Sequence, residues 1–404
     1  MLSVTQARER ILSHFQTTAT ESTPLIACAN RVLAVDVAAT HDLPLFDNSA
    51  MDGFAIRSED TSASRITLRV VADIPAGSVP TVALKAGEAA RIMTGAQLPA
   101  GANAVIPVED TDFHNRDAGT SAPETVSLER AWKAGQNVRL RGMDIHAGDV
   151  VIKKDNLLSR RISVCWRCWE SRTWKFTKKP RVALLSSGDE LLAVDAPLGS
   201  GKIRDSNSYT LAASIESAGS EVLRLGVAKD TRESVEAIFQ KAMSEDVDFI
   251  LSSAGVSVGA FDYVKEVIES NGALDFWRVN MRPGKPLAFG KYFDKKFIGL
   301  PGNPVSAFVG FEVFVRPVLE RLSGQLGSSR RRIKVRSAEE IESDGRESYL
   351  RAILREEDGV QIARLTGHQG SGNLLSLVQA DALLIIPAGV KCVPAGQEVE
   401  ALLL

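Results

Sequence analysis

Four clusters of glycine, acidic and small polar residues hold much of the chemically useful content of this 404-residue chain. Their sequences are SGDE (187–190), AKD (228–230), SAGVSVGAFD (253–262) and PGNPVS (301–306). Each cluster follows a short apolar run of the kind that forms a buried strand. Ligands of α/β sheets bind outside the carboxyl ends of the strands. We therefore expect the four clusters to share one site.

Two of these clusters have the composition of anion-binding loops. Gly255 and Gly259 lie among small residues that let backbone N–H groups approach an anion, next to the start of a predicted helix. In PGNPVS two prolines fix the backbone and place Asn303 and Ser306 at the start of a very apolar helix. A tight strand-to-helix turn without a ligand explains either loop about as well.

Basic and acidic side chains accompany these loops. Arg282 and Lys285 flank a Pro-Gly bend in MRPGKP, and Arg278 lies shortly before it, an arrangement that suits an oxyanion. Five carboxylates are predicted near the same sheet edge: Asp189, Glu190, Asp205, Asp230 and Asp262. Beside anion loops such carboxylates favour Mg²⁺ that bridges to phosphate. The alternatives are a solvated basic turn and helix-capping or solvated carboxylates.

The elements that must position these residues alternate along the chain. Apolar runs at 181–186, 221–227, 247–252 and 296–300 are separated or followed by helical patterns at 207–218, 234–244, 263–270 and 305–322. This alternation predicts a doubly wound, mostly parallel α/β domain over residues 179–323.

The flanking regions have a different texture. Residues 41–137 carry short β runs broken by Gly and Pro, which predicts a small inserted β domain. Residues 1–40 and 138–178 then form one discontinuous, partly helical domain. A Gly-rich basic linker at 323–332 precedes strand-like runs, so residues 324–404 are predicted to form a C-terminal β domain.

Composition excludes several classes of protein. The formal net charge of −2 gives no basic field for nucleic acid, and no apolar run reaches the roughly 20 residues that span a membrane. The amino terminus lacks the apolar core of a signal peptide, so we expect a soluble, cytoplasmic protein. Four scattered cysteines give no disulfide framework. The absence of GxGxxG and GxxxxGK[ST] disfavours dinucleotide enzymes and P-loop NTPases.

The segment SRRISVCWRCWESRTWKF, residues 159–176, departs from its surroundings. It holds three of the five tryptophans and a lone CxxC (Cys165 and Cys168), which is weak support for a zinc or redox site. Its charged and aromatic residues give no consistent apolar face at period 3.6 or 2. We interpret it as a local shift of reading frame, the alternative being a genuine departure in the first domain.

Nine motifs in order resemble the molybdopterin molybdotransferase family from about residue 40 to 375. They are PLFDNSAMDGFA, RIMTGAxLPxGANAVIPVED, VRLRGMDI, SSGDEL, IRDSNSY, SAGVSVGAFDYVK, RPGKPLAFG, GLPGNPVSA and TGHQGSG. The resemblance, which extends to the enzymatic half of gephyrin, implies a homodimer of four-domain subunits. It implies insertion of molybdenum from molybdate into adenylylated molybdopterin with release of AMP, Mg²⁺ as cofactor, and the molybdopterin adenylyltransferase as a candidate partner.

The resemblance also implies roles for individual residues. Catalytic roles fall to Asp52, Asp144, Glu190, Asp230 and Asp262, of which the last three also handle the metal. Substrate binding falls to Thr94, Ser253, Gly255, Gly259, Lys285, Pro301, Asn303, Pro304 and Ser306. Molybdate binding falls to Arg278, Arg282, Arg351 and Ser371. Arg278 and Arg282 stand where many members have lysine, and Ala254 replaces a usual glycine.

Two other functions fit parts of the pattern. A molybdopterin adenylyltransferase would resemble the α/β domain alone, and the flanking β domains with SAMDG and RIMTGA argue against it. A gephyrin-like scaffold without catalysis would be expected to carry an extra interaction domain or a long disordered linker, which we do not find in the sequence.

Overall fold

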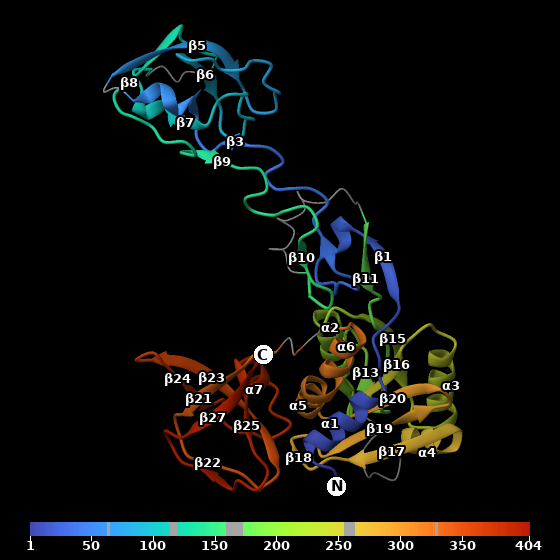
Figure 1. The fold of residues 1–404 in the computed structure, drawn as a ribbon. Helices are drawn as coiled ribbons and strands as arrows, with labels where there is room; N and C mark the ends of the chain where they lie inside the picture. Colours follow the sequence, from blue (N-terminus) through green and yellow to red (C-terminus); the bar gives the residue numbers. More distant parts are fainter. Residues whose placement is uncertain (63–64, 114–118, 159–172, 254–262, 326, 328–329) are drawn as a thin grey trace. The chain divides into compact units, whose positions relative to one another are not determined.

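The computed structural model describes residues 1–62, 65–113, 119–158, 173–253, 263–325, 327 and 330–404 (Figure 1). The chain forms two compact units. Unit 1 comprises residues 1–35, 155–158 and 173–404, and the described part of unit 2 comprises residues 36–154. The predicted fold class is confirmed, since a central α/β sheet, a β part inserted in the sequence and a C-terminal β part are all present. The four predicted domain boundaries stay a prediction.

The centre of unit 1 is a six-stranded sheet in the order β15-β12-β16-β20-β19-β17. The four predicted strands are its parallel part: β12 (Arg181–Ser187), β15 (Glu221–Ala228), β16 (Phe249–Ser253) and β20 (Lys295–Leu300). Two further strands that the sequence reading missed, β17 (Gly272–Arg278) and β19 (Pro286–Tyr292), extend it in antiparallel orientation. The sheet is therefore mixed.

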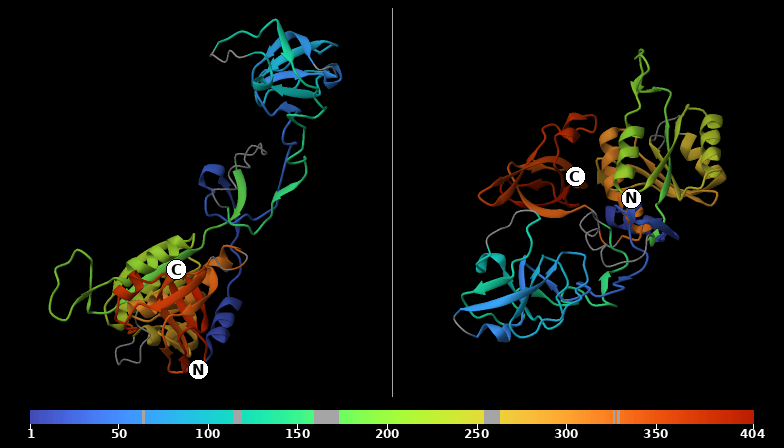
Figure 2. Two further views of the ribbon diagram at one scale, coloured as in Figure 1. Left: turned by 90° about the vertical axis from the view of Figure 1, so that its left-hand side faces the viewer. Right: turned by 90° about the horizontal axis from the view of Figure 1, so that it is seen from above.

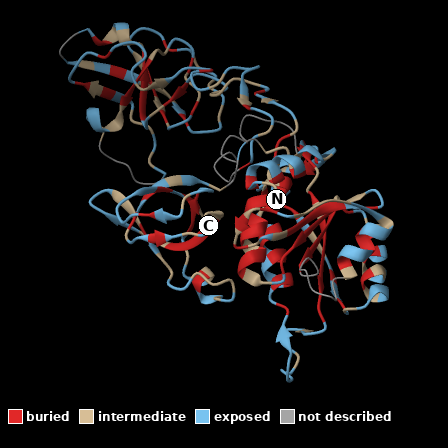
Figure 3. Cartoon of the chain, turned by 90° about the horizontal axis from the view of Figure 1, so that it is seen from below, coloured by how far each residue is buried: buried red, intermediate tan, exposed pale blue. Residues whose placement is uncertain are grey.

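Helices cover both faces of this sheet (Figure 1). One apolar core joins it to α1 (Val4–Ser13), α2 (Asn207–Ser217) and the helix from α5 to α6, and a second joins it to α3 (Arg232–Met243) and α4 (Tyr263–Asn271). Strands β12 and β16 are buried on both sides (Figure 3), which explains their unbroken apolar sequences. Half of the residues of the edge strand β15 are exposed, so the expectation of a buried strand is wrong there. An exposed arm, β13 (Leu191–Leu192) paired with β14 (Ile203–Arg204), projects from the sheet (Figure 2).

The last helix of the α/β part is not uniform. The predicted helix 305–322 is α5 (Pro304–Gly310), a π-helical segment (Phe311–Val315) and α6 (Arg316–Leu322) in succession. Pro317 supplies the physical reason, because a proline inside a helix lacks the N–H and its ring collides with the carbonyl four residues earlier. A wider turn before the proline relieves that collision.

The C-terminal part of unit 1 is a closed barrel in the order β23-β24-β21-β27-β25, in which β25 also pairs with β23. Its strands are β21 (Arg332–Ser337), β23 (Glu347–Glu357), β24 (Val360–Leu365), β25 (Ala382–Ile386) and β27 (Glu398–Leu403). The barrel has its own core, accompanied by the short pair β22 (Ile341–Glu342) and β26 (Cys392–Val393) and by α7 (Leu375–Val378). Strand β18 (Met281–Arg282) pairs with the start of β23 and so joins the barrel to the α/β part.

The two stretches predicted to form the first domain come together through short strand pairs. In unit 1, β1 (Thr20–Pro24) pairs with β11 (Thr173–Thr177). In unit 2, β2 (Val37–Ala38) pairs with β10 (Val150–Ile152). Of the unusual segment 159–176, residues 159–172, with the CxxC and the reading-frame interpretation, lie outside the described residues. In β11, however, Trp174 and Phe176 are buried while Thr173 and Lys175 are exposed, so for these residues the expected lack of an apolar face is wrong.

Unit 2 is built on a five-stranded sheet in the order β7-β4-β6-β5-β8. The strands are β4 (Gly53–Ile56), β5 (Ile66–Ile74), β6 (Glu88–Ile92), β7 (Ala104–Pro107) and β8 (Thr125–Leu128). Two small cores lie on its faces. A further antiparallel pair, β3 (Asn48–Ser49) with β9 (Val138–Arg139), joins the beginning and the end of the inserted segment. None of the helices in the described ranges of either unit is long and apolar enough to cross a membrane.

A buried ion cluster links the α/β part to the segment that leads into the barrel. The fully buried carboxylate of Glu312, in the π-helical segment, accepts two hydrogen bonds from Arg316, at 2.6 and 2.9 Å, and two from Arg330, at 2.9 and 3.0 Å. Burial alone would raise the pKa of Glu312, but the two guanidinium groups outweigh burial and lower it. Glu312 is therefore ionised at neutral pH.

Replacing Glu312 by Gln is expected to lower the free energy of unfolding by about 3 kcal/mol, because it leaves two guanidinium groups without their counter-ion. The lowered folded pKa means that this stabilisation is present above the unfolded value of about 4.3 and is lost as the pH falls through the folded value. Urea unfolding at pH 7 and at pH 3 measures both effects. Glu269→Gln, at an exposed i,i+4 pair with Lys265, is the control and should cost less than about 0.5 kcal/mol. If both variants lower the free energy of unfolding by the same amount, Glu312 is not the counter-ion that stabilises this cluster.

Candidate functional site at the carboxyl edge of the sheet

The parallel strands of unit 1 bring the predicted clusters to one edge. Ser186 of β12 lies level with Ser253 of β16, and Ser253 lies level with Leu300 of β20. The chain that follows these strand ends, and the end of β15, carries Glu190, Asp230 and Pro301 to this edge. Ser253 lies there as well, whereas Gly255, Gly259 and Asp262 lie outside the described residues. The roles of all these residues remain predictions.

The acidic end of the edge is formed by the loops after β12 and β15. The backbone N–H of Asp189 donates to Asp230 Oδ2, and that of Asp230 donates to Asp189 Oδ1, each at 3.2 Å. Each carboxylate keeps a second oxygen outside this reciprocal pair. Gly188 has φ +146°, a backbone conformation that residues with a side chain rarely adopt, so glycine suits this position of the loop. Within the described ranges no three His, Cys, Asp or Glu side chains form a ready metal cluster.

The middle of the edge is the loop 301–306. Asn303 precedes α5 in extended conformation, and Pro304 takes the first helical position, where its missing N–H costs nothing. Asn303 Oδ1 is buried without a hydrogen-bond partner in the described part of the chain, and Ser306 is buried beside it. Buried polar atoms are normally paired, so this loop is suited to a ligand that supplies a donor.

The basic end lies between β17 and β19. Arg278 is paired with Pro286 across these strands, which places the whole MRPGKP loop at the carboxyl edge. Gly284 of this loop lies against the first turn of α5, since a Cβ on it would be 3.6 Å from the Ser306 carbonyl oxygen. The side chain of Arg282 is 40 % exposed, and its guanidinium lies 4.0 Å from Asp344.

Asp344 and Arg346 also lie at this end, and the sequence did not predict them. Arg346 donates to Asp344 at 2.5 and 3.0 Å and to the Met281 carbonyl oxygen at 3.2 Å, so it holds the barrel against the basic loop. These bonds, with Arg346 the main cause, lower the pKa of Asp344. Only the pairing of β18 with β23 brings these residues to the site, and no local sequence pattern predicts a pairing between segments so far apart.

Arg351 lies at the same end but faces inward. Its side chain is fully buried and donates to Ser376 Oγ at 2.9 Å and to the carbonyl oxygens of Gln369 and Gly370 at 3.2 and 2.9 Å. Burial, and then the charge of Arg282, lower the pKa of Arg351. In this structure Arg351 holds the loop that precedes Ser371, which is only half-buried. Direct binding of molybdate by Arg351 stays a prediction.

Three predicted residues lie in unit 2. Asp52 Oδ1 accepts hydrogen bonds from the Thr94 backbone N–H at 2.6 Å and from Thr94 Oγ1 at 2.7 Å, so the structure brings this pair together. The backbone bond first, and the hydroxyl second, lower the pKa of Asp52. Asp144 is exposed on a separate turn, where its N–H donates to the Leu43 carbonyl oxygen.

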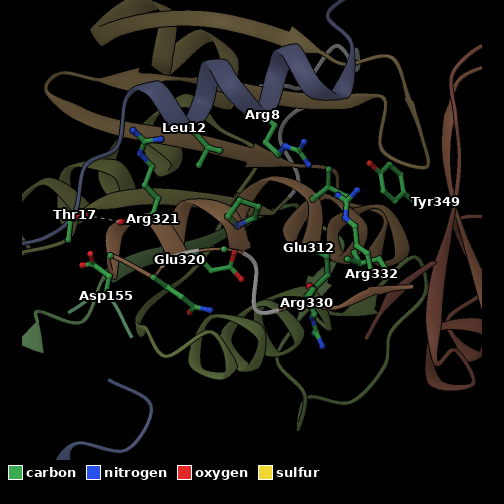
Figure 4. A pocket seen from close by; sticks show the side chains of 16 residues that line it. Arg8, Leu12, Thr17, Asp155, Glu312, Glu320, Arg321, Arg330, Arg332 and Tyr349 are labelled. Atoms are coloured by element: carbon green, nitrogen blue, oxygen red, sulfur yellow. Dashed lines mark hydrogen bonds and ion pairs between the residues drawn. The ribbon is translucent and has the colours of Figure 1, made fainter. Parts of the chain in front are cut away.

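A cavity of about 550 Å³ lies away from this edge, beside the carboxyl-terminal half of the α5–α6 helix (Figure 4). Several arginines line it, but the Arg330 fork is already bound to Glu312 and Arg321 donates to the Phe15 carbonyl oxygen at 2.7 Å. Volume alone does not make this cavity the functional site. At the carboxyl edge, Ser186 Oγ and Asn303 Oδ1 are buried without a partner among the described residues.

The fold defines a multidomain α/β protein in which acidic, neutral and basic loops meet at the carboxyl edge of one sheet. Three family models match the chain: "MoeA N-terminal region (domain I and II)" at residues 2–164, "Probable molybdopterin binding domain" at 183–321 and "MoeA C-terminal region (domain IV)" at 334–404.

Full-length relatives agree with these matches. A molybdopterin molybdenumtransferase of Nostoc is 38% identical over 391 residues, 94% of this chain and 88% of the relative, and that of Bacillus subtilis is 34% identical over 98% and 92%. The crystal structure of the molybdopterin biosynthesis MoeA protein of Pyrococcus horikosii, at 31% identity, matches with a TM-score of 0.83 over 100% of this chain and 99% of that one. The chain belongs to the molybdopterin molybdenumtransferase family.

The Asp52–Thr94 pair can be tested in the intact protein. Thr94→Val removes the hydroxyl but keeps the backbone N–H, so the pKa of Asp52 should rise and yet stay below its ordinary value. Carboxyl ¹³C NMR titration of Asp52 measures this, with Thr94→Ser as the variant that keeps the hydroxyl. If the pKa is the same in Thr94→Val as in Thr94→Ser, the side-chain bond plays no part.

Proposed function

We propose that this chain inserts molybdenum from molybdate into adenylylated molybdopterin and releases AMP. The observation that carries the proposal is the meeting of acidic, neutral and basic loops at one sheet edge in unit 1. The names of the relatives support it, because they match along nearly the whole chain, including the regions outside the α/β part. An adenylyltransferase or a scaffold without catalysis is therefore not favoured.

The residues of the edge have different roles according to their charge. The substrate carries phosphate groups, and molybdate is a dianion. Arg278, Arg282 and Lys285 supply fixed positive charge for the oxyanion. The loop 301–306 supplies a rigid wall that orients the pterin substrate relative to molybdate. The protein then needs no nucleophile of its own, because a molybdate oxygen attacks the pterin-side phosphorus of the pyrophosphate link, the bond from this phosphorus to the bridging oxygen breaks, and AMP leaves with that oxygen. The dithiolene sulfurs then bind the molybdenum and displace the pterin phosphate oxygen from it.

Mg²⁺ fits the acidic end. Glu190 and Asp230 would hold it, together with Asp262 as predicted from the sequence, because Mg²⁺ prefers hard carboxylate oxygens. Asp189 and Asp230 each use one oxygen to accept the other's backbone N–H, and each keeps its second oxygen free of that pair. When bound, the ion offsets the negative charge of the bridging phosphates.

A homodimer is part of the proposal. Four exposed apolar side chains lie on two neighbouring segments of unit 2: Leu45, Phe46, Leu140 and Met143. Backbone hydrogen bonds hold their two segments together, as between the Gly142 N–H and the Pro44 carbonyl oxygen at 3.0 Å. Such a patch suits cover by a second copy, with the adenylyltransferase as the further partner that delivers the substrate. Sedimentation velocity tests the dimer, and a monomer at micromolar concentration would contradict it.

The function is tested by incubating the purified protein with adenylylated molybdopterin, Mg²⁺ and molybdate and following AMP by chromatography. AMP release should require molybdate, and chelation of the divalent ion should slow it. Glu190→Ala should slow Mg²⁺-supported release, with a change in unfolding free energy of about 0.5 kcal/mol or less because the side chain is exposed. AMP release that is absent, or equal without molybdate, rejects the proposed function.

Asp344 offers a test of the basic end. Its carboxylate lies 4.0 Å from Arg282 and competes with any bound dianion. Exposed pairs of this kind are worth roughly 0.5–1 kcal/mol, so Asp344→Asn should lower the half-saturating molybdate concentration about two- to fivefold. Arg282→Ala should raise it, and neither variant should change pterin binding to the same degree. If Arg282→Ala leaves the half-saturating molybdate concentration unchanged, Arg282 is not the oxyanion ligand.

A further inference from the structure

Asn207 connects the end of β16 to the loop after β20, although it was absent from the residues predicted from the sequence. It is the first residue of α2, and its side chain is buried. Its Nδ2 donates to Ser253 Oγ at the end of β16 and to the Gly302 carbonyl oxygen in the loop after β20, each at 2.7 Å. One side-chain amide thus ties together the ends of two neighbouring parallel strands.

The start of α2 is itself held in place. Asp205 Oδ1 accepts the Ser208 backbone N–H at 3.1 Å, and Arg224 donates to Ser208 Oγ at 2.9 Å. The Asn207 side chain is therefore presented from a fixed backbone. Its two N–H hydrogens are directed to two acceptors that belong to different segments of the chain.

The chemistry of the amide determines the direction of the Ser253 hydroxyl. A carboxamide nitrogen only donates, so Ser253 Oγ must accept from Asn207, and its own proton remains for another acceptor. Within the described ranges the Ser253 hydroxyl donates to no protein group. Ser186 Oγ, level with Ser253 on the adjacent strand, is fully buried and has no partner among the described residues. Two hydroxyls with unused hydrogen-bonding capacity thus lie close to the tie.

We propose that Asn207 is a positioning residue for substrate binding. It fixes the end of β16 and the loop after β20 at one spacing, and it turns the Ser253 hydroxyl proton toward an acceptor oxygen of the bound adenylylated molybdopterin. The identity of the ligand rests on the proposed function. Asn207 touches no reacting atom in this scheme and acts through Ser253 and Gly302.

Asn207→Asp tests the direction of the hydrogen bond with almost no change in shape. The carboxylate would accept the Ser253 proton instead of leaving it for the substrate, and it would repel the Gly302 carbonyl. We expect the dissociation constant for adenylylated molybdopterin, measured by calorimetry without molybdate, to rise at least tenfold. The apparent KM should rise with it, while kcat changes less. The matched control is Asn271→Asp, which should leave binding unchanged. Among the described residues, the Asn271 amide donates to the Val267 carbonyl oxygen alone, at the last turn of α4.

A double-mutant cycle separates positioning from general damage. Ser253→Ala removes the hydroxyl on which Asn207 acts, so Asn207→Asp should add less than threefold to the loss in a Ser253→Ala background. Multiplicative losses, or wild-type affinity in Asn207→Asp, would overturn the proposal. If Asn207→Asp does not fold, Asn207→Ala in the same cycle gives the same comparison.

The binding measurement also distinguishes this proposal from the function on which it rests. A wild-type protein that binds the pterin but releases no AMP would reject the proposed function and leave the role of Asn207 decided by the cycle. A wild-type protein that does not bind the pterin would overturn both.

Discussion

The parallel pairing of β12, β16 and β20 is the constraint on which the rest of the structure depends. Their register ends the strands at one level, so Ser187, Ser253 and Leu300 all lie at the same edge of the sheet. The two apolar cores that cover the sheet keep this register, because a slip of one residue would move every side chain to the opposite face. Burial of apolar side chains thus assembles a polar site.

Apolar packing places the loops but does not orient them. Hydrogen bonds from buried polar groups orient them. Asn207 joins two strand ends, Arg351 holds the loop before Ser371, and Glu312 anchors the segment that leads into the barrel. Each is a buried group whose hydrogen bonds run to another part of the chain, where geometry is strict and an unmade bond is costly. Such contacts give the site its shape.

Local patterns in the sequence predicted the parallel strands, the helices and the edge at which the loops meet, because strand and helix periodicity depends on near neighbours. The same patterns missed β17 and β19, and they gave no sign of the β18–β23 pair that brings Asp344 and Arg346 to the basic loop. Arg351 was named only through the family resemblance, and its burial, which follows from the closure of the barrel, was not predicted. Long-range pairing decides such features, and no single segment encodes it.

The strand order also arranges charge along the edge. Asp230 follows β15 and Glu190 follows β12 at one end, Ser253 and the loop 301–306 lie in the middle, and the basic loop joins β17 to β19 at the other end. With neighbouring strands about 4.8 Å apart, the five intervals separate the ends of the row by about 24 Å. A single pocket of mixed charge would neutralise itself through internal ion pairs. A graded edge instead keeps the cations available for a dianion and leaves the carboxylates to a divalent ion, so one extended substrate can meet both environments at once.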